Sequence, residues 1–142
     1  MRAIRNRVSR EDGVAAVEFA LILPVLALLL FGVLEFGRVW SQYQIYQGAA
    51  REGARCAAVK ADPDQDCNIQ VAIDQAAEPF ETSEDATVKL VGGATLGADG
   101  CNDQTIGQDV QASWEQELEV NIPFWNDVTL TPTVKAVFRC EG

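Results

Sequence analysis

The chain has 142 residues, of which 48% are apolar, and this length suits one modest domain with at most one additional element. Its 21 acidic and 11 basic side chains give a net charge of −10, which argues against nucleic-acid binding, because phosphates are neutralised by clustered Lys and Arg. The sequence contains no histidine, which excludes Ser-His-Asp and Cys-His catalysis and every zinc site that uses histidine.

The chain begins with a basic segment that is followed by a long apolar run. Residues 1–13 carry four arginines against two carboxylates, whereas residues 41–142 carry 17 acidic and 6 basic side chains. Between these parts, Val14–Leu34 is a run of 21 residues whose only charge is Glu18, long enough as a helix to cross a hydrocarbon core of roughly 30 Å. The positive-inside rule keeps the arginines in the cytoplasm and sends the acidic body across the membrane. We therefore predict a cytoplasmic leader, then a transmembrane helix over residues 14–40.

The helix is predicted to continue beyond the membrane. An alanine-rich sequence without proline extends as far as Pro63, which indicates a helical stalk over residues 41–60. Glu35 and Arg38 are three residues apart and are expected to pair on one helix face. The aromatic residues expected at the outer headgroups are Trp40, Tyr43 and Tyr46. One narrow face of this helix, made mostly of small residues, is expected to pack on the chain's own C-terminal part or, alternatively, on other subunits. Its residues are Gly48, Ala49, Glu52, Gly53 and Cys56.

Residues 61–142 are predicted to form the head. A short helix over residues 68–77 ends at Pro79, and from Ala86 onward apolar and polar residues alternate, which indicates antiparallel strands with one apolar face. The alternation covers residues 86–90, 118–124 and 128–139, with loops at 92–93 and 97–107. Pro132 predicts that the last strand begins late or lies at a sheet edge. The predicted fold class is α+β, with a long N-terminal transmembrane and stalk helix followed by a small antiparallel-sheet head with a short helix.

Four cysteines lie beyond the apolar run, at Cys56, Cys67, Cys101 and Cys140. An even number of cysteines in an exported body indicates two disulfides, and no C-x-x-C spacing is present. Three connectivities are open, and we favour 56–67 with 101–140 because neither loop then crosses the other.

An acidic turn precedes the short helix. Asp62, Asp64 and Asp66 alternate like the beginning of a calcium loop. However, the sixth position is Cys67 instead of glycine, and the twelfth is Ile73 instead of glutamate. We therefore interpret this segment as a solvated turn, with calcium binding as the alternative, and predict neither a metal nor a cofactor.

The N-terminal region has the pattern of type IV pilin-like precursors: a basic leader, Gly13, then Val14, with Glu18 and the aromatic Phe19 in the fifth and sixth positions counted from Val14. Three blocks within this region are similar to the TadE family, the minor pilins or pseudopilins of the tight-adherence (Tad/Flp) pilus system. They are GVAAVEFALILPVL at 13–26, FGVLEFGR at 31–38 and AAREGAR at 49–55.

This resemblance implies an inner-membrane prepilin that a dedicated aspartyl prepilin peptidase cuts between Gly13 and Val14. Its expected partners are the lipid bilayer, other pilins and the Tad assembly machinery. A carboxylate such as Glu18 costs roughly 2.5–3.5 kcal/mol at the centre of a membrane on insertion scales. The new amine of Val14, with a pKa of about 8, would be cationic and would pair with Glu18 of an adjacent subunit.

Two alternatives remain open at this point. The first concerns Glu18 alone, which lies close to the membrane edge and would instead reach water beside Arg10. The second concerns the function of the chain, which would be an unprocessed, single-pass membrane-anchored adhesin or binding domain. An exported enzyme is the weakest hypothesis, because we find no catalytic constellation in the sequence.

Overall fold

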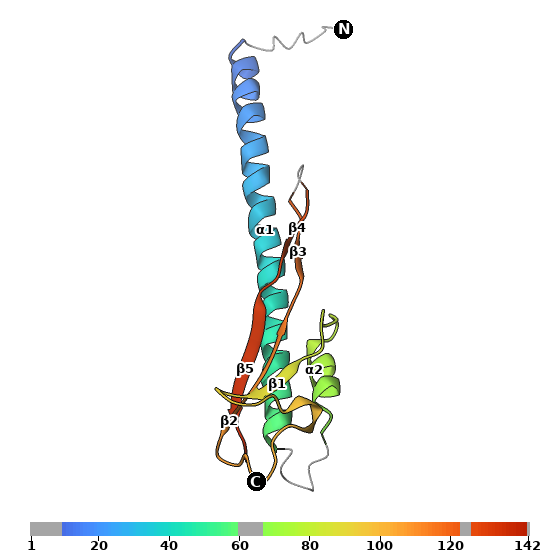
Figure 1. Cartoon of the computed structure of the whole chain (residues 1–142). Helices are drawn as coiled ribbons and strands as arrows, with labels where there is room; N and C mark the ends of the chain where they lie inside the picture. Colours follow the sequence, from blue (N-terminus) through green and yellow to red (C-terminus); the bar gives the residue numbers. More distant parts are fainter. Residues whose placement is uncertain (1–9, 60–66, 123–125, 142) are drawn as a thin grey trace.

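The protein, shown as a computed structural model in Figure 1, is a long helix that carries a small head along its C-terminal half. The structure describes residues 10–59, 67–122 and 126–141. Its elements are helices α1 (Arg10–Val59) and α2 (Ile69–Ala77), the 3₁₀ turn η1 (Gly97–Asp99), and strands β1 (Thr87–Leu90), β2 (Asp109–Glu115), β3 (Leu118–Val120), β4 (Val128–Leu130) and β5 (Thr133–Arg139). This α+β layout, with a long apolar helix before a short helix and small antiparallel sheets, confirms the predicted fold class.

Helix α1 runs through Pro24 and extends to Val59, so the helix continues beyond the apolar run, as the sequence predicted. Within the described residues, the segment Gly13–Val59 is the one helix that is long and apolar enough to cross a membrane. The rest of the chain buries none of its most apolar window. A helix with an apolar surface all round and no cover from its own chain is suited to a lipid environment.

The C-terminal part of α1 forms the centre of the head. It packs against α2, β2, β3 and β5. Its fully buried alanines are Ala49, Ala50, Ala54 and Ala57. Ile73 of α2 is fully buried and lies so close to Gly53 that a Cβ atom there would overlap the Ile73 side chain. The predicted packing face was wrong at two positions, because Gly48 and Glu52 are exposed while the alanines face the head.

The described residues of the head form two antiparallel sheets. The first has the order β1-β2-β5, with Ala112 of β2 opposite Val88 on one side and Ala136 on the other. The second consists of β3 and β4, with Leu118 opposite Leu130. As Pro132 predicted, β5 starts just after it and lies at an edge of its sheet. The sequence analysis missed β2, although β2 is the central strand.

A buried glutamine lies at the corner between the two sheets. Gln116 is only 2% exposed, and its Oε1 accepts hydrogen bonds from Trp114 Nε1 at 2.9 Å and from the Ser83 backbone N–H at 3.2 Å. Its Nε2 donates to Ser83 Oγ at 2.8 Å. One side chain therefore joins the end of β2 to the loop that precedes β1, and all these polar groups are satisfied.

The end of α1 is held by backbone donors from elsewhere in the head. The last carbonyls of a helix have no partner within the helix. Here the Ala57 carbonyl accepts from the Cys101 N–H at 2.9 Å, and the Ala58 carbonyl accepts from the Glu141 N–H at 3.0 Å. The disulfides join Cys56 to Cys67 and Cys101 to Cys140, each with 5.8 Å between Cα atoms, in the pairing that the sequence favoured.

Some sequence-based predictions lie outside the described residues. They are residues 1–9 of the leader predicted over 1–13, the predicted acidic turn with Asp62, Asp64 and Asp66, and the apolar position Phe124.

Candidate functional site

The N-terminal half of α1 exposes a continuous apolar surface. Its large side chains are about 50–70% exposed, for example Val14 at 60%, Leu21 at 72% and Leu30 at 61%. Soluble monomers rarely expose contiguous apolar patches larger than a few hundred Å². This surface therefore requires lipid or other protein helices to cover it.

Gly13, Val14 and Glu18 lie together at the beginning of this surface. Val14 and Glu18 are four residues apart and so lie on the same face of α1. The Glu18 side chain is exposed, and no side chain in the described part of the chain pairs with it. Space around Gly13 is open, with no heavy atom within 4 Å of a Cβ built there. The cut after Gly13 and the pairing of Glu18 remain predictions.

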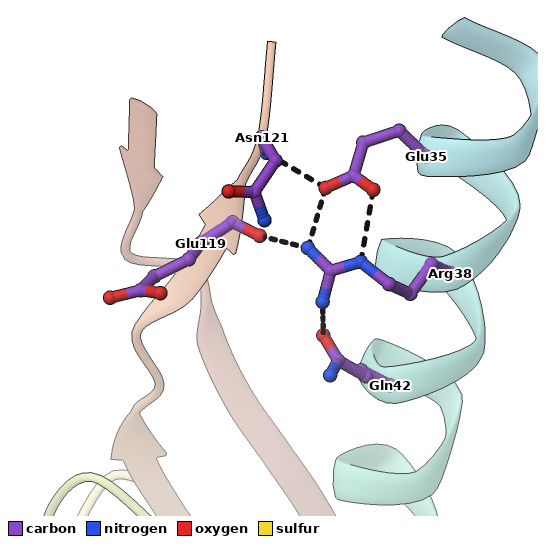
Figure 2. Close-up of polar contacts among 5 residues, drawn as sticks. All are labelled: Glu35, Arg38, Gln42, Glu119 and Asn121. Atoms are coloured by element: carbon purple, nitrogen blue, oxygen red, sulfur yellow. Dashed lines mark hydrogen bonds and ion pairs between the residues drawn. The ribbon is translucent and has the colours of Figure 1, made fainter. Parts of the chain in front are cut away.

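The other end of the apolar surface is a polar junction between α1 and the head (Figure 2). The Arg38 guanidinium donates to both carboxylate oxygens of Glu35, at 3.0 and 2.5 Å. Its Nη2 also donates to the Glu119 carbonyl at 2.6 Å, while its Nη1 donates to Gln42 at 3.4 Å. The Asn121 N–H donates to Glu35 at 2.7 Å. The helix thus binds the backbone edge of strand β3 through one charged pair.

The Glu35–Arg38 pair is present as predicted, but its contacts with the head were missed. The partners are the backbone carbonyl of Glu119 and the backbone N–H of Asn121. A backbone group carries no residue-type signature, so the sequence contains no signal for this contact. The arrangement neutralises two opposite charges immediately after an apolar run and satisfies two groups at the edge of a sheet.

An apolar groove lies beside the junction, between α1 and the β3–β4 hairpin. On α1 it extends from Leu28 to Tyr43, and the hairpin contributes Leu118, Val120, Ile122 and Leu130. The volume of the groove is about 460 Å³. It is open to solvent, and its described lining residues are mostly apolar; the polar ones are Glu35 and Asn121, and the Asn121 N–H binds Glu35.

The three aromatic residues predicted at the headgroups have separate roles. Trp40 is 53% exposed and stacks on Phe36 with 6.1 Å between ring centroids. Tyr43 is half-buried, and Tyr46 is only 5% exposed. The Tyr46 hydroxyl donates to the Glu81 carbonyl at 3.1 Å, and burial raises the pKa of Tyr46. The predicted belt is therefore wrong for Tyr46, which belongs to the core of the head.

The described residues offer no group of three or more histidine, cysteine or acidic side chains that could hold a metal ion. All four cysteines are consumed in the two disulfides. What the described side chains provide is an apolar helix surface, one polar junction and a disulfide-bonded head, which together suit packing and anchoring.

The comparisons with known proteins agree with this description of the N-terminal half. Residues 13–55 match the family model described as TadE-like protein, which confirms the resemblance found in the sequence. The match begins at Gly13 and stops before α1 ends, so α2 and the strands of the head lie outside it. A search of the curated proteins and a search of the solved structures each found no match.

Proposed function

We propose that this TadE-like, Tad pilus-associated chain is a processed minor pilin or pseudopilin, a structural component that initiates, primes or caps a Tad/Flp-type pilus. The observation that carries the proposal is the unpartnered apolar half of α1, which holds one exposed carboxylate, Glu18. A surface of this kind is suited first to lipid and then to packing against the helices of other subunits. No enzymatic activity is part of this function.

The proposed location is the inner membrane, with the N-terminus in the cytoplasm and the head on the far side. The charge asymmetry of the chain supports this orientation, because the leader is basic and the body acidic. The disulfides support it as well, since Cys56–Cys67 and Cys101–Cys140 both belong to the exported part, and disulfides persist in oxidising compartments.

Processing by a prepilin peptidase between Gly13 and Val14 is the first step of the proposed pathway. The TadE-like match begins at Gly13, which supports that boundary. Gly13 also lies in the first turns of α1, and glycine is a weak helix former, so the bond can leave the helix at small cost. Cleavage would give Val14 a free amine.

Assembly then depends on Glu18. Its charge is expensive in an apolar layer when alone and tolerable when paired. Val14–Leu34 contains no basic side chain, so the amine of Val14 on an adjacent subunit is the cation best placed to pair with it. This pairing would set the axial register between packed helices.

Intact-mass analysis of membrane-extracted protein tests the processing step. We expect the loss of residues 1–13 when the peptidase is present. Gly13→Ala keeps a small side chain and should retain partial cleavage, whereas Gly13→Leu should abolish it. A mature chain of full length would contradict processing and favour the membrane-anchored adhesin or binding domain instead.

The role of Glu18 is tested by comparing pilus-associated with membrane-retained protein. Glu18→Ala should leave membrane insertion and cleavage intact while incorporation into pili falls. Glu18→Gln is the matched control for shape and should be nearly as harmful, because it loses the charge that the pair requires. If both variants assemble like the wild type, Glu18 is a carboxylate that only reaches toward water at the membrane edge.

A further inference from the structure

The β3–β4 hairpin lies closer to the N-terminus of α1 than the rest of the head does. Figure 1 shows it beside the middle of α1, apart from the rest of the head. The Asn121 N–H binds Glu35, which is the first charged residue after the uncharged stretch that begins at Phe19. From Glu35 the groove beside the hairpin continues along α1 toward its N-terminus as far as Leu28, a distance of about 10 Å at 1.5 Å per residue.

This height coincides with the outer edge of the apolar span. If the span begins near Val14, a hydrocarbon core of roughly 30 Å ends close to Glu35. The end of the groove beside Leu28 and Gly32, nearest the N-terminus of α1, then lies at the depth of the outer-leaflet acyl chains. The Glu35–Arg38 pair lies at the headgroups, where a neutralised ion pair is tolerated.

The hairpin itself has one apolar face and one polar face. Alternation along β3 and β4 places Leu118 and Val120 with Val128 and Leu130, while Glu119 and Thr129 share the opposite face. The apolar side chains that remain exposed are Ile122 at 38%, Val128 at 43% and Leu130 at 48%. Nothing in the described part of the chain covers them.

The charges on the hairpin are compatible with this height. Continuing the β3–β4 register by one residue places the exposed Asp127 opposite Asn121, level with Glu35. The carboxylate of Asp127 therefore lies with the other polar groups at the headgroups instead of deeper in the hydrocarbon. Asn121 and Asp127 of the hairpin thus share one level with Glu35 of α1, and Ile122, which lines the groove, lies on the membrane side of this level.

We propose that the β3–β4 hairpin is a second membrane contact, and that acyl chains of the outer leaflet fill the end of the groove that Leu28 and Gly32 of α1 form with Ile122, just after β3. This inference rests on the proposed membrane anchoring of α1. Lipid is the occupant because this end of the groove is continuous with the exposed apolar surface of α1 and lies at the same depth. The head is thereby held against the membrane surface on the side of the hairpin.

The test uses the full chain in phosphatidylethanolamine–phosphatidylglycerol vesicles that contain doxyl-labelled lipid as a quencher. Because all four native cysteines are in disulfides, one added cysteine carries an environment-sensitive fluorophore specifically. Ile122→Cys reports on the membrane end of the groove, and Asp127→Cys is the matched control on the opposite, polar face at nearly the same level. Both residues are exposed, so neither substitution opens a cavity. Leu28→Cys reports on the span itself, and Glu84→Cys reports on an exposed part of the head.

We expect the label at position 122 to be blue-shifted and to lose most of its emission to the doxyl lipid, as the label at position 28 does. The label at 127 should be quenched much less, and the label at 84 should not be quenched. Quenching at 28 with none at 122 would overturn this inference while leaving membrane anchoring intact. No quenching at 28 would instead contradict the anchoring on which the proposed function depends. A shift at 122 that grows with the protein-to-lipid ratio and is insensitive to doxyl lipid would assign the groove to a second copy of the chain and would also overturn the inference.

Discussion

Helix α1 has two regions that differ in the exposure of their apolar side chains. Before Trp40 the large apolar side chains are exposed, such as Phe36 at 68%, whereas Ala49, Ala54 and Ala57 further along are fully buried. The buried region uses small residues so that α2 and the strands can approach the helix closely. The exposed region uses large ones, which gain most from transfer out of water. The size of the apolar side chains, more than their number, distinguishes the part of α1 that packs inside the head from the part that is exposed.

The largest loss in the free energy of unfolding is expected from variants that destabilise the head and leave the exposed region of α1 unchanged. Replacing Cys101 and Cys140 by serine opens a loop of 39 residues and should lower the free energy of unfolding by about 4 kcal/mol on the chain-entropy estimate. The Cys56→Ser, Cys67→Ser pair opens a loop of 11 and should cost about 3 kcal/mol. Urea unfolding in detergent micelles, followed by tryptophan fluorescence, measures both. A larger loss for the shorter loop would contradict this order.

The buried glutamine at the corner between the two sheets gives the next effect. Gln116→Leu would leave Trp114 Nε1 and the Ser83 N–H without their acceptor in a buried site. We expect a loss of about 1–3 kcal/mol in the free energy of unfolding. Gln116→Glu keeps an acceptor for both donors but removes the donor to Ser83, and it should become less harmful as pH falls and the carboxyl group is protonated. A loss that is equal for both variants at every pH would show that shape alone matters.

Substitutions at two glycines test where the buried face of α1 ends and the exposed face begins. Gly53→Ala places a methyl group against the buried Ile73 and should destabilise the head by about 1–2 kcal/mol. Gly48→Ala meets nothing within 4 Å and should stabilise the helix by up to about 1 kcal/mol, because alanine is the better helix former. Thermal unfolding of the two variants should shift in opposite directions, and a shift in the same direction would contradict the packing of α2 on α1.

The smallest effect on stability concerns the junction at Glu35. Arg38→Met keeps the length of the side chain but removes its bonds to Glu35 and to the Glu119 carbonyl. Exposed ion pairs contribute little to global stability, so the unfolding midpoint should hardly change. Hydrogen exchange of the Asn121 amide should nevertheless become faster, because its acceptor Glu35 is no longer held in place. Unchanged exchange at Asn121 would mean that the hairpin is positioned without the ion pair.

The elements with strong local signals were predicted well from the sequence. Helix α2 starts after Asn68, whose side chain accepts from the Val71 N–H, and it ends at Ala77, shortly before Pro79. Strand β5 follows Pro132 directly. In each case one residue both favours an element and limits its extent.

The missed features depend on contacts between distant residues. Val110, Ala112 and Trp114 alternate with polar residues in β2, but the small Ala112 and the preceding glycine-rich stretch weaken the pattern. Ala112 is suited to the centre of the sheet because α1 lies close to β2, which the local sequence does not reveal. In the candidate site, Gly13, Val14 and Glu18 were found from their motif, whereas Arg38 binds a backbone carbonyl 81 residues away.

The unbroken course of α1 has a mechanical consequence. The same 50-residue helix passes from the apolar surface into the core of the head with no hinge between them. A pull along the helix axis therefore loads the contacts of α1 with α2 and the strands in shear, so that many of them resist together instead of opening one after another. At the far end, Cys101 and Glu141 bind the last carbonyls of the helix, and the disulfide between Cys101 and Cys140 prevents these two segments from peeling apart. Because α1 continues from the apolar surface into the head, a rotation of its apolar part about the helix axis reaches the head through the contacts of α1 with α2, β2 and β5.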